Sequence, residues 1–202
     1  MEYELLGWPD DGVRLALDYR AFSYAGKFAA SNTGKAAAVD PDADAFDPGQ
    51  SSNAPPPAAV EDAVDPGPVV GAVAFNGDRA DADAAWVRYV TVRRDRRGEG
   101  VGPRLVAFTT ARLRARDYER VRIAVNNPFA YEALYRAAFA FTGEETGVAE
   151  LVLAHPPEDR SRETYQAGLD AFRERETPEG DERAFLDRKR GAEPPPVVDL
   201  PE

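Results

Sequence analysis

The chain of 202 residues contains no cysteine and a single histidine, His155. Without cysteine there is no disulfide, no thiolate metal ligand and no cysteine nucleophile, and one histidine cannot build a multi-histidine metal centre. We therefore expect no metal site. Any chemistry must come from oxygen-bearing side chains, backbone groups or a bound cofactor.

Long apolar runs are also missing. The chain has no run of about eighteen apolar residues, which is the length that a membrane-spanning helix needs. The first residues lack the basic-then-apolar order of a secretory signal peptide. We expect a cytoplasmic location and no membrane association. The length and the 43% hydrophobic content suit one full-sized core.

Lysine is scarce, since only Lys27, Lys35 and Lys189 contribute to the 25 basic residues, and the rest are arginines. Asp and Glu number 36, which gives a net charge of -11. This surplus repels phosphate backbones, so we expect no nucleic-acid partner. The acidic, arginine-rich composition is similar to that of halophilic proteins, whose carboxylates keep the surface hydrated in high salt. A GC-rich genome is the alternative explanation for the arginine and alanine content.

Residues 40–68 lack any apolar periodicity and are rich in proline, acidic and small residues. Such a segment buries too little apolar surface to offset the entropy of ordering, so it is predicted to be an insertion or a flexible linker. After His155 the composition turns polar again. We divide the chain into a domain over residues 1–154, which contains the insertion, and a C-terminal extension over residues 155–202.

The extension carries its own helical pattern. Tyr165, Leu169 and Phe172 recur at helical spacing and predict an amphipathic helix, and a shorter helix is predicted around Phe185. The proline-rich residues 191–202 are predicted to form a loose tail.

The best-patterned part of the chain is residues 69–154, where predicted strands and helices alternate. Strands are predicted over 13–19, 69–78, 85–92, 120–126, 139–145 and 148–154, with a turn at Asn76-Gly77. Helices are predicted over 103–117, with Leu105, Thr109 and Leu113 on one face, and from Asn127-Pro128 onward. The buried stripe of the second helix is predicted to be Ala130, Ala133, Leu134, Ala137 and Ala138.

Glycines at 98, 100 and 102 separate the strand that ends at Val92 from the helix that contains Pro103. A glycine-rich turn before a helix presents unpaired backbone N–H groups and the positive end of the helix dipole, which suits a diphosphate. An ordinary glycine-containing turn is the alternative, and the neighbouring arginines leave nucleic acid as a third interpretation.

Two common phosphate motifs do not fit this turn. A P-loop needs Gly-Lys-Ser/Thr, whereas Gly102 is followed by Pro103 and Arg104. A dinucleotide fingerprint needs G-x-G-x-x-G and an acid at the end of the next strand, where Asn126 stands here.

Residues Arg97 to Gly102 read R-x-x-G-x-G between a predicted strand and a predicted helix. In this setting the motif resembles the GNAT-type N-acetyltransferase superfamily. The core order of that superfamily, strand, strand, helix, strand, helix and two strands, matches residues 69–154. The resemblance implies an α/β fold with a twisted, mixed, mostly antiparallel sheet, helices on both faces, and splayed central strands that bind coenzyme A. Residues 1–39 look too short for the strand, two helices and strand that precede this core.

The resemblance also implies acetyl-CoA as donor, with backbone amides of the turn holding its pyrophosphate and the strand before it bonding to the pantetheine. The implied coenzyme A residues are Val90, Val92, Arg97, Gly98, Glu99, Gly100, Val101, Gly102 and Asn127. Tyr135 is the implied general acid toward the departing thiolate, and Tyr131 is the alternative. A phenol is protonated at neutral pH, as this role requires.

The implied reaction is direct attack on acetyl-CoA by an unidentified primary amine in a ternary complex, by a monomer or a homodimer. The lack of cysteine agrees with direct transfer. One alternative is a non-catalytic acyl-CoA-binding or regulatory module, and another is an interaction factor that acts through its C-terminal helices. The general base is not identified, and the carboxylates near the expected cleft are interpreted as solvated charges: Glu132, Glu144, Glu145 and Glu150.

Overall fold

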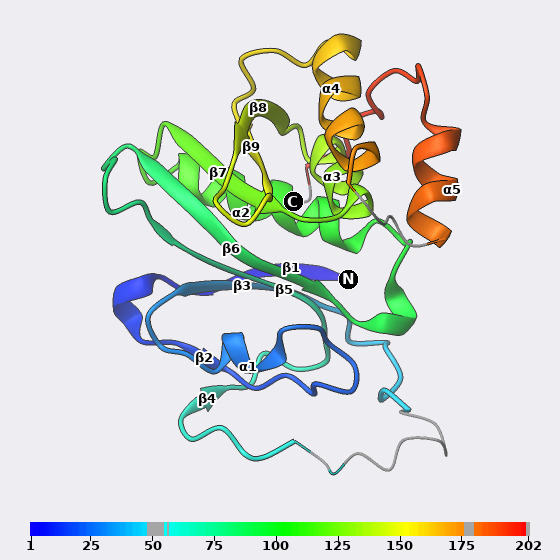
Figure 1. Cartoon of the computed structure of the whole chain (residues 1–202). Helices are drawn as coiled ribbons and strands as arrows, with labels where there is room; N and C mark the ends of the chain where they lie inside the picture. The colour runs from blue at the N-terminus through cyan, green and yellow to red at the C-terminus, as the bar shows by residue number, and fades with distance from the viewer. Residues whose placement is uncertain (48–54, 56, 176–179, 201–202) are drawn as a thin grey trace.

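The computed structural model describes residues 1–47, 55, 57–175 and 180–200. Its centre is a seven-stranded mixed sheet in the order β1-β3-β5-β6-β7-β9-β8, with a separate pair β2-β4 (Figure 1). The strands are β1 (Glu2–Gly7), β2 (Arg14–Leu15), β3 (Gly34–Val39), β4 (Ala63–Val64), β5 (Val69–Gly77), β6 (Ala84–Val92), β7 (Arg120–Val125), β8 (Ala140–Glu145) and β9 (Leu151–His155). In the main sheet only β6 and β7 pair in parallel, so the predicted mixed, mostly antiparallel sheet is confirmed.

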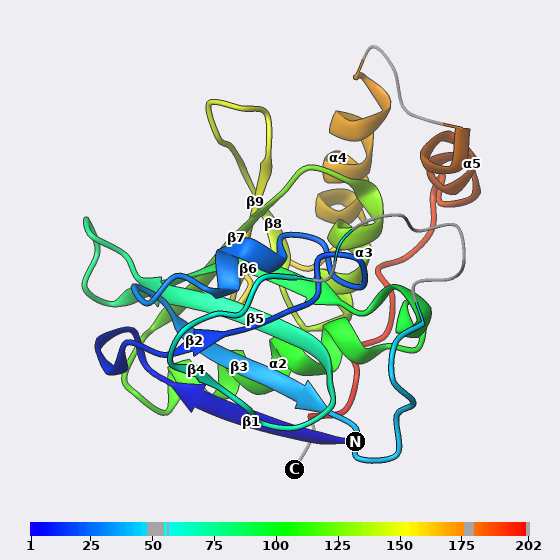
Figure 2. The same cartoon turned by 90° about the horizontal axis from the view of Figure 1, so that it is seen from below.

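Helices cover both faces of this sheet, as predicted. The α-helices are α1 (Ala25–Phe28), α2 (Val101–Arg114), α3 (Pro128–Arg136), α4 (Arg162–Arg173) and α5 (Gly180–Arg188), and the short 3-10 helices are η1 (Pro9–Asp11) and η2 (Arg94–Arg96). The helices α2 and α3 lie on one face, and α1 with β2 and β4 lies on the other (Figures 1 and 2). Within the described residues no helix combines the length and the apolarity that a membrane span requires.

The strand β5 is buried on both sides because it separates two hydrophobic clusters. Val73 and Phe75 belong to the larger cluster with α2, whereas Ala72 and Ala74 face the smaller cluster around Phe28. Alternation along a strand sends successive side chains to opposite faces, so a continuous apolar run is what a doubly covered strand needs. The face of α2 predicted from Leu105, Thr109 and Leu113 is buried, each residue being at most 1% exposed.

The N-terminal predictions need correction. Residues 13–19 do not form a strand, because only Arg14 and Leu15 pair with β4, and β1 was not predicted. Asn76 and Gly77 are not a turn either, since both pair with β6. Between β1 and β3 the structure has one four-residue α-helix, which agrees with the expectation that this segment is too short for two full helices.

Lys35 ties the N-terminal loops to the sheet and is fully buried on β3. Its Nζ donates to the carbonyl oxygens of Val13, Ala30 and Thr33 at 2.6, 2.7 and 2.9 Å. Burial lowers the pKa of Lys35 to about 8. The three bonds anchor both ends of the segment that contains α1, which positions that segment beside the sheet.

Part of the predicted insertion is anchored to the domain, although residues 48–54 and 56 lie outside the described residues. Asp40 forms an ion pair of 2.9 Å with Arg96, and the carbonyl oxygen of Asp44 accepts a bond of 3.0 Å from Arg93. The described start of the insertion is therefore bonded to the segment between β6 and α2, and it is not a free linker there.

The C-terminal extension is part of the main core. Tyr165, Leu169 and Phe172 of α4 are at most 2% exposed and share one hydrophobic cluster with α2 and α3. The predicted loose tail is wrong, because Pro195 is buried and the N–H of Val198 donates to Arg136 O at 2.8 Å.

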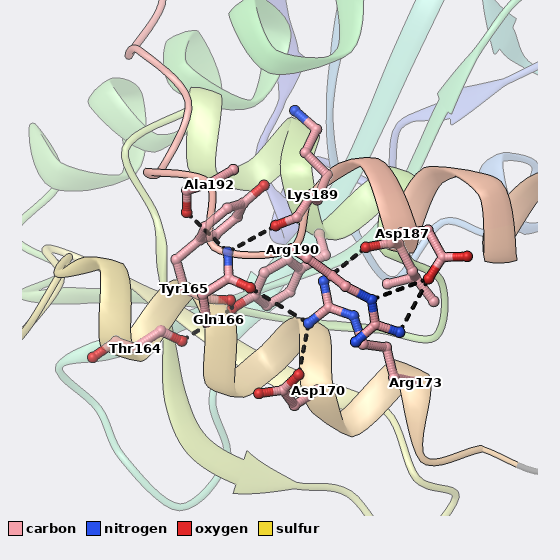
Figure 3. A network of polar contacts seen from close by, with 11 residues as sticks. Thr164, Tyr165, Gln166, Asp170, Arg173, Asp187, Lys189, Arg190 and Ala192 are labelled. Atoms are coloured by element: carbon pink, nitrogen blue, oxygen red, sulfur yellow. Dashed lines mark hydrogen bonds and ion pairs between the residues drawn. The ribbon is translucent and has the colours of Figure 1, made fainter.

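Polar bonds join α4 and α5 side by side (Figure 3). The Gln166 side-chain amide donates to the carbonyl oxygens of Lys189 and Ala192 at 2.9 and 2.8 Å. Arg173 donates to Leu186 O at 2.7 Å and pairs with Asp170 at 2.6 Å. The end of α5 is thereby fixed to a helix that belongs to the core.

Candidate active site

A cleft with a volume of about 870 Å³ is lined mainly by β6, β7, α2, α3 and the loop between β6 and α2. It exists because β6 and β7 pair only over Ala84–Val87 and Arg120–Ile123. Beyond these pairs β6 stays bonded to β5 and β7 stays bonded to β9, so the two strands diverge. Each strand therefore has one unpaired backbone edge facing the cleft, which can bond to an extended ligand.

The N-terminus of α2 closes the wide end of this cleft. Gly98 and Gly100 have φ values of +86° and +78°, in the left-handed region that favours glycine. Gly100 is the N-cap residue, and no side chain caps the helix. The first N–H groups of α2 and the positive end of its dipole are thus available to an anion.

Most of the residues predicted to bind coenzyme A lie on the cleft. The lining residues among them are Val90, Val92, Arg97, Gly98, Gly100, Val101, Gly102 and Asn127. Glu99 is not a lining residue, because its carboxylate is turned to Arg96 at 2.7 Å. The Asn127 side chain caps α3 by accepting a bond of 2.9 Å from the N–H of Ala130.

Two arginines of the cleft are not neutralised by an ion pair. The charged lining residues are Arg88, Arg96, Arg97, Arg136, Glu132 and Glu150. Arg96 is paired with Asp40 and Glu99, and Arg136 is paired with Glu132, whereas Arg88 and Arg97 have no ion pair within the described residues. Unpaired cations on a cleft attract ligands of negative charge.

A family model described as the acetyltransferase (GNAT) family matches residues 30–141 of this chain. The chain belongs to the GNAT acetyltransferase family. The predicted resemblance and fold class are therefore confirmed. No curated protein matches the chain.

Solved structures similar to this GNAT chain are distant in sequence. The PaiA N-acetyltransferase from Thermoplasma acidophilum, solved with coenzyme A, has 13% identity to this chain and a TM-score of 0.38. The match covers 43% of this chain and 53% of that protein. A GCN5-related N-acetyltransferase from Kribbella flavida has 18% identity and a TM-score of 0.44, covering 61% of this chain and 67% of that one. Nourseothricin acetyltransferase has 19% identity and a TM-score of 0.41, covering 76% and 96%.

The two tyrosines of α3 in this GNAT domain point away from the cleft. Tyr131 and Tyr135 are fully buried and do not line it, whereas Leu134 between them does. The Tyr131 hydroxyl donates to Tyr135 Oη at 3.3 Å, and the N–H of Phe141 donates to the same oxygen at 3.1 Å. Burial raises the pKa of both phenols. The general-acid role of Tyr135 thus remains a prediction that this geometry does not favour.

The predicted buried stripe of α3 is correct only in part, because Leu134 and Ala137 are buried in the main core but Ala130, Ala133 and Ala138 are not. Ala130 and Ala133 are only half-buried and face the cleft, whereas the tyrosines occupy the buried side. Tyr131 stacks on Tyr165 of α4 with ring centroids 5.8 Å apart. The extension therefore decides which face of α3 is buried.

Glu132 is a cleft residue whose environment the sequence did not indicate. It was interpreted as a solvated charge, but it is only 8% exposed. Its carboxylate accepts a bond of 3.0 Å from the Tyr165 hydroxyl and pairs with Lys189 at 2.7 Å. Because both partners belong to the extension, Glu132 connects the cleft wall to α4 and to the residue that follows α5.

We expect the Tyr135→Phe variant to keep most of its turnover. A general acid contributes on the order of 100-fold or more, and a hydroxyl that does not reach the cleft contributes none of this. The variant leaves the N–H of Phe141 without its partner, which costs about 1–3 kcal/mol of stability. Release of CoA in the presence of an accepted amine measures turnover, and thermal unfolding measures stability. A loss of about 100-fold in turnover with unchanged stability would restore the predicted role.

Proposed function

We propose that this chain transfers the acetyl group of acetyl-CoA to a primary amine by direct attack in a ternary complex. The observation that carries the proposal is the diverging β6-β7 pair that leads to the uncapped N-terminus of α2. Pantetheine has two amides and no charge, so it suits the free backbone edge at Val90 and Val92. The pyrophosphate suits the helix N-terminus after Gly98 and Gly100.

We also propose a domain organisation, which the packing of the extension supports. The acetyltransferase domain occupies residues 1–154, and the extension over residues 155–202 completes its core. Phe185 of α5 lines the cleft beside Phe129 of α3, with ring centroids 4.9 Å apart. The extension therefore forms part of the ligand-facing surface in this proposal.

Direct transfer agrees with the chemistry of the cleft. The chain has no cysteine that could carry the acetyl group. A thiol has a reference pKa near 8.5, so a departing thiolate can take a proton from water without a buried phenol. The residues of this chain then serve mainly to bind and orient the two substrates.

The test is to measure acetyl-CoA binding by calorimetry and CoA release over a broad panel of amines. The proposal expects saturable binding and amine-dependent release. Absence of acetyl-CoA binding would refute it.

The second candidate is a non-catalytic acyl-CoA-binding module, and the buried position of Tyr135 favours it. It predicts tight acetyl-CoA binding without amine-dependent CoA release. The same two measurements therefore distinguish the candidates.

A further inference from the structure

Arg88 occupies a bulge at the narrow end of the cleft. Ala74 pairs with Tyr89 and Phe75 with Val87, so Arg88 is the extra residue on β6 without a partner on β5. It directly follows Val87, the last residue of β6 that pairs with β7. The bulge therefore places Arg88 where the two strands begin to diverge.

The Arg88 side chain is held in position by neutral groups. Its Nε donates to Asn76 Oδ1 at 2.6 Å, and its guanidinium carbon lies 5.3 Å from the centroid of the Trp86 ring. Within the described residues no hydrogen bond engages its two terminal nitrogens, which can therefore donate to a ligand. An arginine fork oriented in this way matches a carboxylate, which accepts two parallel bonds.

Within the described residues Arg88 has no ion pair. Asp78 is the nearby acid that attracts it, but both oxygens of Asp78 are engaged. One accepts a bond of 2.6 Å from Trp86 Nε1, and the other accepts a bond of 2.8 Å from the N–H of Ala80. An unpaired cation on a cleft in a chain with excess acid indicates a site for an anion.

Two aromatic rings line the same cleft as Arg88, and a lysine lies over one of these rings. Tyr24 and Tyr89 line the same cleft, with ring centroids 5.9 Å apart. Lys27 lies 5.8 Å from the centroid of the Tyr89 ring and, like Arg88, has no salt bridge in the described part of the chain. An anion that carries apolar groups would match this end of the cleft.

The phosphates of the donor are not that anion. They are assigned to Gly98–Gly102, whereas Arg88 precedes Val92 by four residues on the same strand. A strand advances about 3.3 Å per residue, so Arg88 and the end of β6 are roughly 13 Å apart. The turn assigned to the phosphates lies beyond this end of β6, so we assign the anion at Arg88 to the other substrate.

We propose that the acceptor is an amine that also carries a carboxylate, as an amino acid does, and that Arg88 binds this carboxylate. The inference rests on the proposed function. The amine nitrogen forms the new C–N bond to the acetyl carbon, and the C–S bond breaks with its electron pair on sulfur. The amine loses one proton to water, and the departing CoA thiolate takes one proton from water and leaves as the thiol. Arg88 is a specificity residue in this reaction, and Tyr24 and Tyr89 flank the acceptor.

The experiment compares free amino acids with their C-terminal amides at saturating acetyl-CoA, and it includes a polyamine that has no carboxylate. The variants are Arg88→Gln and the control Arg112→Gln, whose guanidinium lies over Phe108 away from the cleft. We expect the wild type to prefer acids over amides in kcat/KM. A charge-assisted bidentate bond supports a preference on the order of 10- to 100-fold. Arg88→Gln should remove this preference and leave acetyl-CoA affinity unchanged, whereas Arg112→Gln should keep it.

Two outcomes overturn the inference while the proposed function stands. In the first, amides or polyamines are acetylated as efficiently as the free acids. In the second, the preference for acids over amides survives in Arg88→Gln. Acetyl-CoA binding without transfer to any amine overturns the inference together with catalysis, and it leaves the non-catalytic module. Loss of acetyl-CoA binding in Arg88→Gln places Arg88 on the donor instead. Direct binding of N-acetylated amino acids in the presence of CoA gives a readout that does not depend on turnover.

Discussion

Substituting Gly100 by glutamate should remove detectable acetyl-CoA binding. Gly100 has φ of +78° and forms the N-cap of α2, so a side chain there is strained and lies at the proposed pyrophosphate site. A Cβ at this position would come within 3.2 Å of Arg104 Nη1. The added carboxylate would also occupy the helix N-terminus and repel the phosphates. We expect a loss of affinity of at least about 100-fold by calorimetry, which corresponds to about 2.7 kcal/mol.

Gly143→Glu is the matched control for this variant. Gly143 has φ of +82° and open space around it, and it lies on β8 outside the cleft. The control imposes the same kind of backbone strain and the same added charge, but acetyl-CoA affinity should stay unchanged. A Gly100→Glu variant that binds acetyl-CoA with normal affinity would refute the assignment of this turn. Gly100→Ala separates strain from charge, since it should lose less affinity than the glutamate variant.

The sequence was informative where burial and local chemistry act on the same residues. The segment from β5 to α3 was predicted because each element there has a continuous or periodic apolar face. The turn before α2 was predicted from its glycines, and Gly98 and Gly100 adopt the positive φ that favours glycine. The missed strand β1 also carries a signal, since Glu2 and Glu4 alternate with Tyr3 and Leu5. This signal is weak because β1 is an edge strand whose residues remain partly or fully exposed.

The errors arose where distant segments decide the local structure. Residues 13–19 alternate like a strand, yet only Arg14 and Leu15 pair in one, and Leu15 and Leu17 pack against the far face of β5. On α3 two faces were compatible with helical spacing, and the sequence pattern favoured the alanines. The tyrosines are buried because α4 covers them, and the Tyr135 hydroxyl finds its partners inside the core. No pattern within α3 itself encodes that contact.

Removing residues 156–202 should produce a chain that does not fold cooperatively. The extension contributes five buried side chains to the main core: Tyr165, Leu169, Phe172, Phe185 and Leu186. Burial of one large apolar side chain stabilises a protein by about 1.5–3 kcal/mol. Five of them supply on the order of 10 kcal/mol, which is as large as the whole stability of a typical domain. Loss of a sigmoidal thermal transition in circular dichroism would show this directly.

The truncation also distinguishes two roles of the extension: it is either part of the hydrophobic core or a surface that binds a partner protein. A truncated chain that folds and binds acetyl-CoA normally would contradict the core role and favour a partner.

Leu169→Ala gives the graded test, because deleting a fully buried leucine costs about 2–5 kcal/mol. Val148→Ala is its control, since Val148 is 77% exposed and should change stability by less than about 0.5 kcal/mol. If both variants unfold at the same temperature, α4 does not stabilise the domain; if only Leu169→Ala is less stable, the packing of α4 contributes to the stability of the domain.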